Sequence, residues 1–236
     1  MEIPSNKRWY ARNIVIDLEF TPVSKDHGVG GLKQEIIEIG AVKLDDRGEF
    51  CGEFSRLVSP ELADGVERHV KALTSISSYD AYNAEPLNVV LFQFQNWIGD
   101  LSARMITWSG ADRLQLRREC RAKRIPTDRM PGDWLDIQPL FPALMGIDRE
   151  LVALEDAAEW YGISAQDEQL HHALTDARIT AGLLKGLMAR SLVEQPEARA
   201  VRERLGRDGS LESGESSAQA KLRKLSALLK VQEALG

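Results

Sequence analysis

Three runs typical of β-strands follow one another near the start of the chain, and this order most constrains the fold. The runs cover residues 12–18, 35–45 and 50–58, and the second is rich in β-branched residues. Turn-forming residues over 45–48 separate the second run from the third. We therefore expect an antiparallel arrangement of these strands, with a hairpin between the second and the third.

Helical and strand patterns alternate in the rest of the chain. The patterns predict a helix over 86–99, a strand over 105–108, a helix from Asp112 through Cys120, a short strand over 134–137, and helices over 154–161 and 173–190. Three antiparallel strands followed by alternating helices and strands indicate an α/β fold. We expect one mixed five-stranded sheet flanked by helices.

Two carboxylates stand at the C-terminal end of the first strand. Residues 13–16 form an apolar, β-branched run, and Asp17 and Glu19 follow it. Side chains two apart on a strand share a face, so these carboxylates lie side by side. They repel each other unless a positive charge lies between them. Mg²⁺ or Mn²⁺ suits such oxygen ligands; the alternative is an ordinary strand end that reaches solvent.

A third carboxylate lies on the apolar face of the helix predicted over 173–190. Asp176 precedes Ile179 and Thr180 by three and four residues, so it shares the stripe that faces the sheet. A buried carboxylate is costly unless it is paired or bound to a metal. His171 would lie about 140° from Asp176 on one continuous helix, so it fits a loop before the helix better. There its imidazole can accept a proton from water near neutral pH.

Two assignments stay open on local grounds. His172 competes with His171 for the role of the base, and a tandem histidine at a helix start is also a common polar cap. Asp112 follows a strand and the turn Ser109-Gly110, where an Asp is most often the N-cap of the next helix.

Together, these residues resemble the DEDD exonuclease superfamily, also called DnaQ-like, in which four carboxylates arrive in three ordered motifs beginning with D-x-E. The resemblance assigns these carboxylates to Asp17, Glu19, Asp112 and Asp176. The subclass with an H-x(4)-D third motif, DEDDh, matches residues 171–176 and implies that His171 is the general base. The resemblance also implies a ribonuclease-H-like fold.

The resemblance implies hydrolysis of phosphodiesters with two divalent cations, Mg²⁺ or Mn²⁺, about 4 Å apart. Asp17 would bridge both ions, and Glu19 and Asp176 would complete the site that activates water. Asp112 would hold the second ion near the leaving 3′ oxygen. His171 would accept the proton of the attacking water, and a 5′-mononucleotide would leave the 3′ end.

Features around the first motif bear on the substrate. The long loop after D-x-E, followed by residues 34–42, resembles the exoribonucleases that trim the 3′ ends of histone messages and small RNAs. A single-stranded RNA 3′ end is therefore favoured over DNA. Thr21 matches a family position next to the substrate 3′ end, and Phe20 either stacks on the terminal base or belongs to the core. The glycine-rich loop over 22–33 is predicted to be a flexible rim of the active site.

Two other classes of function stay open. A DNA 3′–5′ exonuclease or a polymerase proofreading subunit shares the same motifs. A non-catalytic nucleic-acid-binding module is the second alternative, although all five expected catalytic positions carry the appropriate residue types.

The chain is acidic, with a formal net charge of -6 and a pI of about 5.4. This balance disfavours nonspecific attraction to polyanions. A basic stretch over 113–129 is either the solvated face of a helix or a contact with the nucleic-acid backbone. We expect a substrate held at its last few nucleotides.

The sequence predicts an exonuclease domain over 8–190 and a helical extension over 191–236. Residues 206–217 have the composition of a flexible linker, and residues 218–235 form an amphipathic helix. This helix either packs on the domain or mediates self-association or binding of a protein partner.

The chain has no expected membrane contact and is predicted to be cytoplasmic. Its N-terminus lacks the apolar core of a signal peptide, and no segment has the length needed to span a bilayer. Cys51 and Cys120 lack metal-ligand spacing, which favours two reduced thiols.

Overall fold

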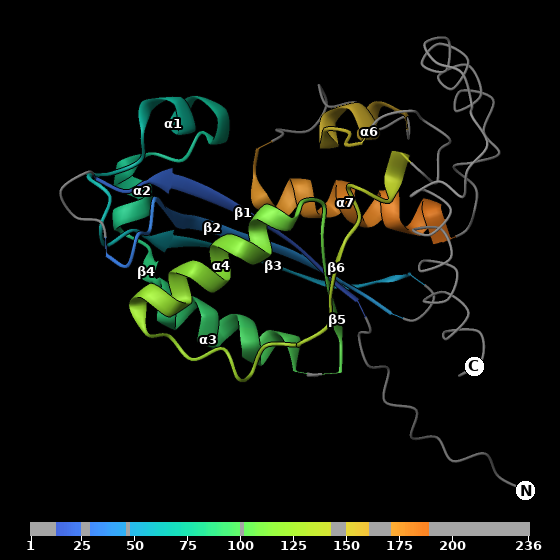
Figure 1. The fold of residues 1–236 in the computed structure, drawn as a ribbon, viewed down its shortest axis with the longest axis horizontal. Coiled ribbons are helices and arrows are strands. Elements are labelled where there is room, and N and C mark those ends of the chain that lie inside the picture. Colours follow the sequence, from blue (N-terminus) through green and yellow to red (C-terminus); the bar gives the residue numbers. More distant parts are fainter. Residues whose placement is uncertain are drawn as a thin grey trace, which may run out of the picture.

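The computed structural model describes residues 13–24, 29–45, 48–99, 102–142, 150–160 and 171–188. Within them, a six-stranded sheet has the order β4-β3-β2-β1-β5-β6, and helices cover both of its faces (Figure 1). The extension expected over 191–236, with its linker and amphipathic helix, lies outside these residues.

The first three strands form the antiparallel part of the sheet, as the sequence predicts. Central strand β1 (Asn13–Pro22) pairs with β2 (Gln34–Leu44), which in turn pairs with β3 (Phe50–Ser59). The pairing of β1 with β2 shifts between Glu19 and Phe20, which bends the end of β1.

The other strands join in parallel. Strand β5 (Arg104–Thr107) pairs with β1, and β6 (Trp134–Asp136) pairs with β5. Strand β4 (Glu85–Pro86) adds to β3 and makes the sheet six-stranded rather than five-stranded. A strand of two residues is too short to show the alternation from which strands are predicted.

Six helices of the described residues surround the sheet. They are α1 (Arg68–Thr74), α2 (Ser78–Tyr82), α3 (Leu87–Ile98), α4 (Gly110–Lys123), α6 (Leu154–Trp160) and α7 (Ala173–Met188). The last four match the predicted helices to within a few residues. Helices α1 and α2 were not predicted, although Ser77 and Asp80 form a capping box at the start of α2.

The sheet separates two hydrophobic cores. Helices α6 and α7 cover one face and α3 and α4 cover the other (Figure 1). Alternate residues of β1 enter opposite cores, because Val15 packs on the α7 side whereas Ile14 and Ile16 pack on the α3 side. The next odd positions of β1, Asp17 and Glu19, therefore face α7.

Two expectations about the whole chain can be compared with the described residues. Cys51 is exposed and Cys120 is buried, and the two do not form a disulfide bond with each other. Among the helices described, none combines the length and the apolar character that crossing a bilayer requires.

Candidate active site

Strand β1 continues beyond the end of β5, and this offset makes room for a side chain from α4. Pairing of β1 with β5 ends at Val15 and Ile106, whereas pairing of β1 with β2 continues to Pro22. Leu18 therefore has no partner on β5, and its backbone N–H donates to the carboxylate of Asp112. This contact brings the second predicted motif to the end of β1.

Asp112 is not the N-cap of α4, contrary to the interpretation from local sequence. Ser109 fills that position, and its Oγ accepts from the N–H of Ala111 at 3.1 Å. Asp112 is the third helical residue and is only 5% exposed. Its carboxylate accepts from its own backbone N–H in the first turn of α4 and also reaches the end of β1 at Leu18.

The third motif meets the first motif at α7. Oxygen or nitrogen ligand atoms of Glu19, His171 and Asp176 all lie within 4.8 Å of one another. Asp176 Oδ1 is buried and has no hydrogen-bond partner within the described part of the chain. A buried carboxylate oxygen without a partner is costly, so it indicates a position that a cation can fill.

Two residues of β2, Gly40 and Glu38, position the start of α7. A Cβ atom at Gly40 would lie 2.1 Å from the carbonyl carbon of Ala173, so only glycine allows this approach. Glu38 Oε2 accepts from the Ala173 N–H at 3.1 Å and lies 3.6 Å from His172 Nδ1. The docking of α7 on β2 therefore brings Asp176 to β1.

The two histidines have different surroundings. His171 lies before α7, as expected, with a φ of 67°, which is a strained left-handed conformation for a residue with a side chain. Its Nε2 lies 3.2 Å from Glu155 Oε1 of α6. His172 instead lies beside Glu38. The geometry thus groups His171, rather than His172, with Glu19 and Asp176.

Burial and mutual repulsion raise the pKa values of the two β1 carboxylates. Burial raises the pKa of Glu19 to about 8, and the charges of Asp176 and Glu38 add to this effect. The pKa of Asp17 is raised well above its usual value by burial and by the charges of Asp112 and Asp176. Residues from β1, β2, α4 and α7 thus share one electrostatic cluster.

The pKa values of Asp112 on α4 and Asp176 on α7 are raised as well. Burial raises the pKa of Asp112 to about 7, although its own N–H and that of Leu18 oppose the change. Burial also raises the pKa of Asp176 to about 6, and the neighbouring His171 opposes it. Raised pKa values in a group of acids indicate missing positive charge.

The residues present fit divalent cations. The donors are carboxylate oxygens and one imidazole, and no cysteine enters the cluster, which matches hard ions such as Mg²⁺ or Mn²⁺. The unpartnered Asp176 Oδ1 and the repulsion around Asp17 are both relieved by a cation at this place.

Glu38 was not predicted to belong to the site. It is 5% exposed and pairs directly opposite Glu19. The available signal was an acidic residue between isoleucines in a strand that is apolar on both sides.

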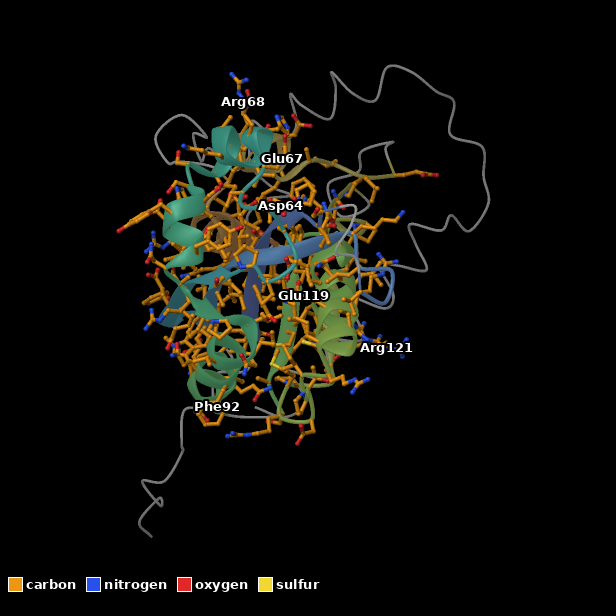
Figure 2. All side chains as sticks on the ribbon, turned by 90° about the vertical axis from the view of Figure 1, so that its left-hand side faces the viewer. Asp64, Glu67, Arg68, Phe92, Glu119 and Arg121 are labelled. Carbon is orange, nitrogen blue, oxygen red and sulfur yellow. The ribbon has the colours of Figure 1, made fainter. Side chains whose placement is uncertain are left out.

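The two residues predicted to contact substrate have contacts within the protein. Phe20 packs against the core on the α3 side of the sheet, which favours the core interpretation. Thr21 is fully buried, and its Oγ1 donates to Gly65 O at 3.3 Å and accepts from the Glu67 N–H at 3.0 Å. Thr21 therefore fixes the loop before α1, whose Asp64 and Glu67 are labelled in Figure 2.

A mixed sheet with helices on both faces and an acidic cluster at the end of its central strand defines a nuclease of the ribonuclease-H-like class. Residues 14–184 match a family model described as exonuclease (RNase T), and the chain belongs to this exonuclease family.

Individual relatives agree with this family. The chain is 28% identical over 205 residues to ERI1 exoribonuclease 2 of Xenopus laevis, covering 76% of this chain and 29% of that protein. It is 33% identical over 90 residues to a PolC-type DNA polymerase III of Staphylococcus saprophyticus, covering 38% of this chain and 6% of that protein. The chain spans less than a third of the length of these relatives.

A solved structure shares the fold. The nuclease domain of 3'hExo, described as a DEDDh family member bound to rAMP, superposes with a TM-score of 0.66 and 21% sequence identity. The match covers 80% of this chain and 96% of that domain.

Proposed function

We propose that this chain is a metal-dependent 3′–5′ exonuclease that hydrolyses single-stranded RNA from its 3′ end and releases 5′-mononucleotides. One observation carries the proposal: Asp17, Glu19, Asp112 and Asp176 converge from three elements of the fold, with His171 beside them. Membership of the exonuclease family supports the reaction, and similarity to proteins named exoribonucleases supports RNA as the substrate.

The carboxylates hold two cations in this proposal. Asp17 would contribute to both ion positions, Glu19 and Asp176 to one of them, and Asp112 to the other. When bound, Mg²⁺ or Mn²⁺ neutralises the negative charge that develops on the scissile phosphate and lowers the pKa of coordinated water.

His171 accepts the proton of the attacking water. Its ring is 38% exposed, so it reaches both solvent and the carboxylate cluster. Contact with Glu155 orients the ring and stabilises the positive charge that it gains. Glu38, by holding the Ala173 N–H, fixes the backbone that follows His171.

Digestion of 5′-labelled single-stranded RNA and matched DNA tests the proposal. The expected result is shortening from the 3′ end in Mg²⁺ or Mn²⁺, none in chelator, and faster loss of RNA than of DNA. Asp17→Asn should lower the rate at least about 1,000-fold with an unchanged circular dichroism spectrum. An active and folded Asp17→Asn protein would show that the site is wrongly assigned.

A DNA 3′–5′ exonuclease is the second candidate. The similarity to a PolC-type DNA polymerase over 90 residues favours it. The same digestion decides between the two candidates, because faster shortening of DNA would replace RNA as the substrate. Retention of labelled RNA without cleavage would instead indicate a binding module.

A further inference from the structure

Helix α4 and its C-cap, Arg124, carry a set of arginines. Four of them are exposed: Arg117, Arg118, Arg121 and Arg124. Within the described part of the chain, the side chains of these four residues form no ion pair. Figure 2 shows Arg121 projecting outward from α4, whereas Glu119 points toward the sheet.

Two basic side chains on α7 are instead paired with glutamates of the sheet side. Arg178 lies 2.6 Å from Glu53, and Lys185 lies 2.9 Å from Glu49. On α4 itself, Lys123 is 8% exposed and binds two buried glutamates at 2.7 and 2.9 Å. Lys123 therefore belongs to the core, and the basic stretch of the sequence divides into a buried lysine and an outer row of arginines.

The outer row has a direction relative to the acidic cluster. Arg113, Arg117 and Arg121 are four residues apart, so they share one face of α4, and Arg124 follows as the left-handed C-cap of the helix. The row is about 16 Å long at 1.5 Å per residue. It begins next to Asp112 and leads away from the cluster. We call these four residues the arginine face.

Two cavities border α4 and are lined by cations. One, of about 360 Å³, lies between α4 and strands β5 and β6 and is lined by Arg113, Arg117 and Trp134. The other, of about 540 Å³, lies beside the start of β2 and is lined by Lys33 and Arg118. The surface around α4 is thus hollowed and mostly basic, with one acidic residue, Asp136, in the lining of the first cavity.

The first cavity also holds an aromatic ring. The guanidinium carbon of Arg113 lies 5.7 Å from the centre of the Trp134 ring. Arg113 Nε is buried and has no hydrogen-bond partner among the described residues. The guanidinium and the indole both line this cavity, and such groups bind phosphates and bases, respectively.

We propose that the arginine face binds the sugar-phosphate backbone of the single strand upstream of its 3′-terminal nucleotide, which rests on the function proposed above. The overall charge of -6 repels a polyanion, so binding concentrates where unpaired cations gather. The arginine face is such a place, and it starts beside Asp112. Backbone contacts of this kind carry no sequence preference.

The double variant Arg117→Gln/Arg121→Gln tests this proposal. KM for a 15-nucleotide single-stranded RNA should rise about tenfold. The effect should vanish with the p-nitrophenyl ester of a nucleoside 5′-monophosphate, which is too short to reach the arginine face. A control, Arg56→Gln/Lys185→Gln, removes the same charge from β3 and α7 and should leave KM for the RNA unchanged.

Salt dependence gives a second readout. Each phosphate contact contributes about 0.7 to the slope of log Kd against log salt for a single strand. The slope of the double variant should therefore be smaller by about 1.4 than that of the protein with both arginines. Kd is measured in the Asp17→Asn background, where the RNA stays intact.

The outcomes separate the two proposals. An unchanged KM and salt slope for RNA would overturn the role of the arginine face and leave an acidic protein as its partner. An equal rise in KM for the RNA and for the ester would also overturn this role, because the arginines would then act through the fold or the metal centre. If the unmodified protein cleaves neither substrate, the proposed function fails, and the Kd slope alone decides on the arginine face.

Discussion

Replacing Glu19 with Gln should abolish activity and yet stabilise the metal-free protein above neutral pH. Burial raises the pKa of Glu19 from 4.5 to about 8. Between these values the folded protein keeps a proton that the unfolded chain releases. The free energy of unfolding therefore falls as the pH rises through this window. A neutral Gln at this position removes that loss.

The size of the effect follows from the same values. A pKa raised from 4.5 to about 8 corresponds to a loss of at most about 5 kcal/mol once the group is ionised. Glu19 is only partly buried, so water screens part of the repulsion, and we expect about 2 kcal/mol. For a domain of this size, that raises Tm by about 4–8 °C at pH 8.5.

Thermal unfolding in chelator at pH 5 and pH 8.5 measures this prediction. At pH 5 the folded protein keeps Glu19 protonated. The increase in the free energy of unfolding caused by Glu19→Gln should therefore fall below about 1 kcal/mol. Glu49→Gln makes the same chemical change at an exposed ion pair and should shift Tm little at either pH. Added Mg²⁺ or Mn²⁺ should raise Tm of the unmodified protein more than that of Glu19→Gln.

Two results would refute the reasoning. A lower Tm for Glu19→Gln than for the unmodified protein at pH 8.5 would mean that the carboxylate stabilises the metal-free fold. An equal rise in Tm for Glu19→Gln at pH 5 and pH 8.5 would mean that the added stability does not come from removing the charge of Glu19.

Three further predictions concern the base and the packing around the site. His171→Ala should lower the single-turnover cleavage rate at least about 100-fold more than His172→Ala, and the reverse ranking would overturn the choice of base. Gly40→Ala should cost more than about 3 kcal/mol in urea unfolding, because its Cβ meets backbone at 2.1 Å; Gly132→Ala, whose Cβ meets nothing within 4 Å, is the control. Lys123→Met should cost about 3–5 kcal/mol in the same assay by leaving two buried glutamates unpaired, and a loss under 1 kcal/mol would contradict this.

The sequence predicted most of the fold because its main elements are long and strongly patterned. Strands β1, β2 and β3 and helices α3, α4 and α7 each extend over ten or more residues. Helices α1 and α2 have seven and five residues, too few for an apolar stripe to repeat.

Asp17 and Glu19, and likewise His171 and Asp176, form short local motifs that the sequence reveals, whereas Asp112 was assigned through the family resemblance. The residues that support these side chains could not be found in this way. Glu38 accepts a hydrogen bond from a residue 135 positions away, and this pairing depends on how α7 docks on β2. The close approach at Gly40 depends on the same docking. No local pattern contains either contact.

Helical phase and strand parity explain where the structure places Lys123 and Phe20. Lys123 follows Glu119 by four residues and shares the inner face of α4 with it, although composition alone groups it with the arginines. Phe20 packs in the α3-side core together with Ile14 and Ile16, on the face opposite Asp17 and Glu19.

The position of α7 has a consequence for the order in which the protein becomes functional during synthesis. A growing chain that has emerged as far as β6 already contains Asp17, Glu19 and Asp112, but it lacks the helix that carries Asp176. N-terminal elements fold first on the ribosome, yet the early sheet has only part of the ligand set. A nascent chain would therefore complete the candidate site only when α7 docks against Gly40 and Glu38 of β2.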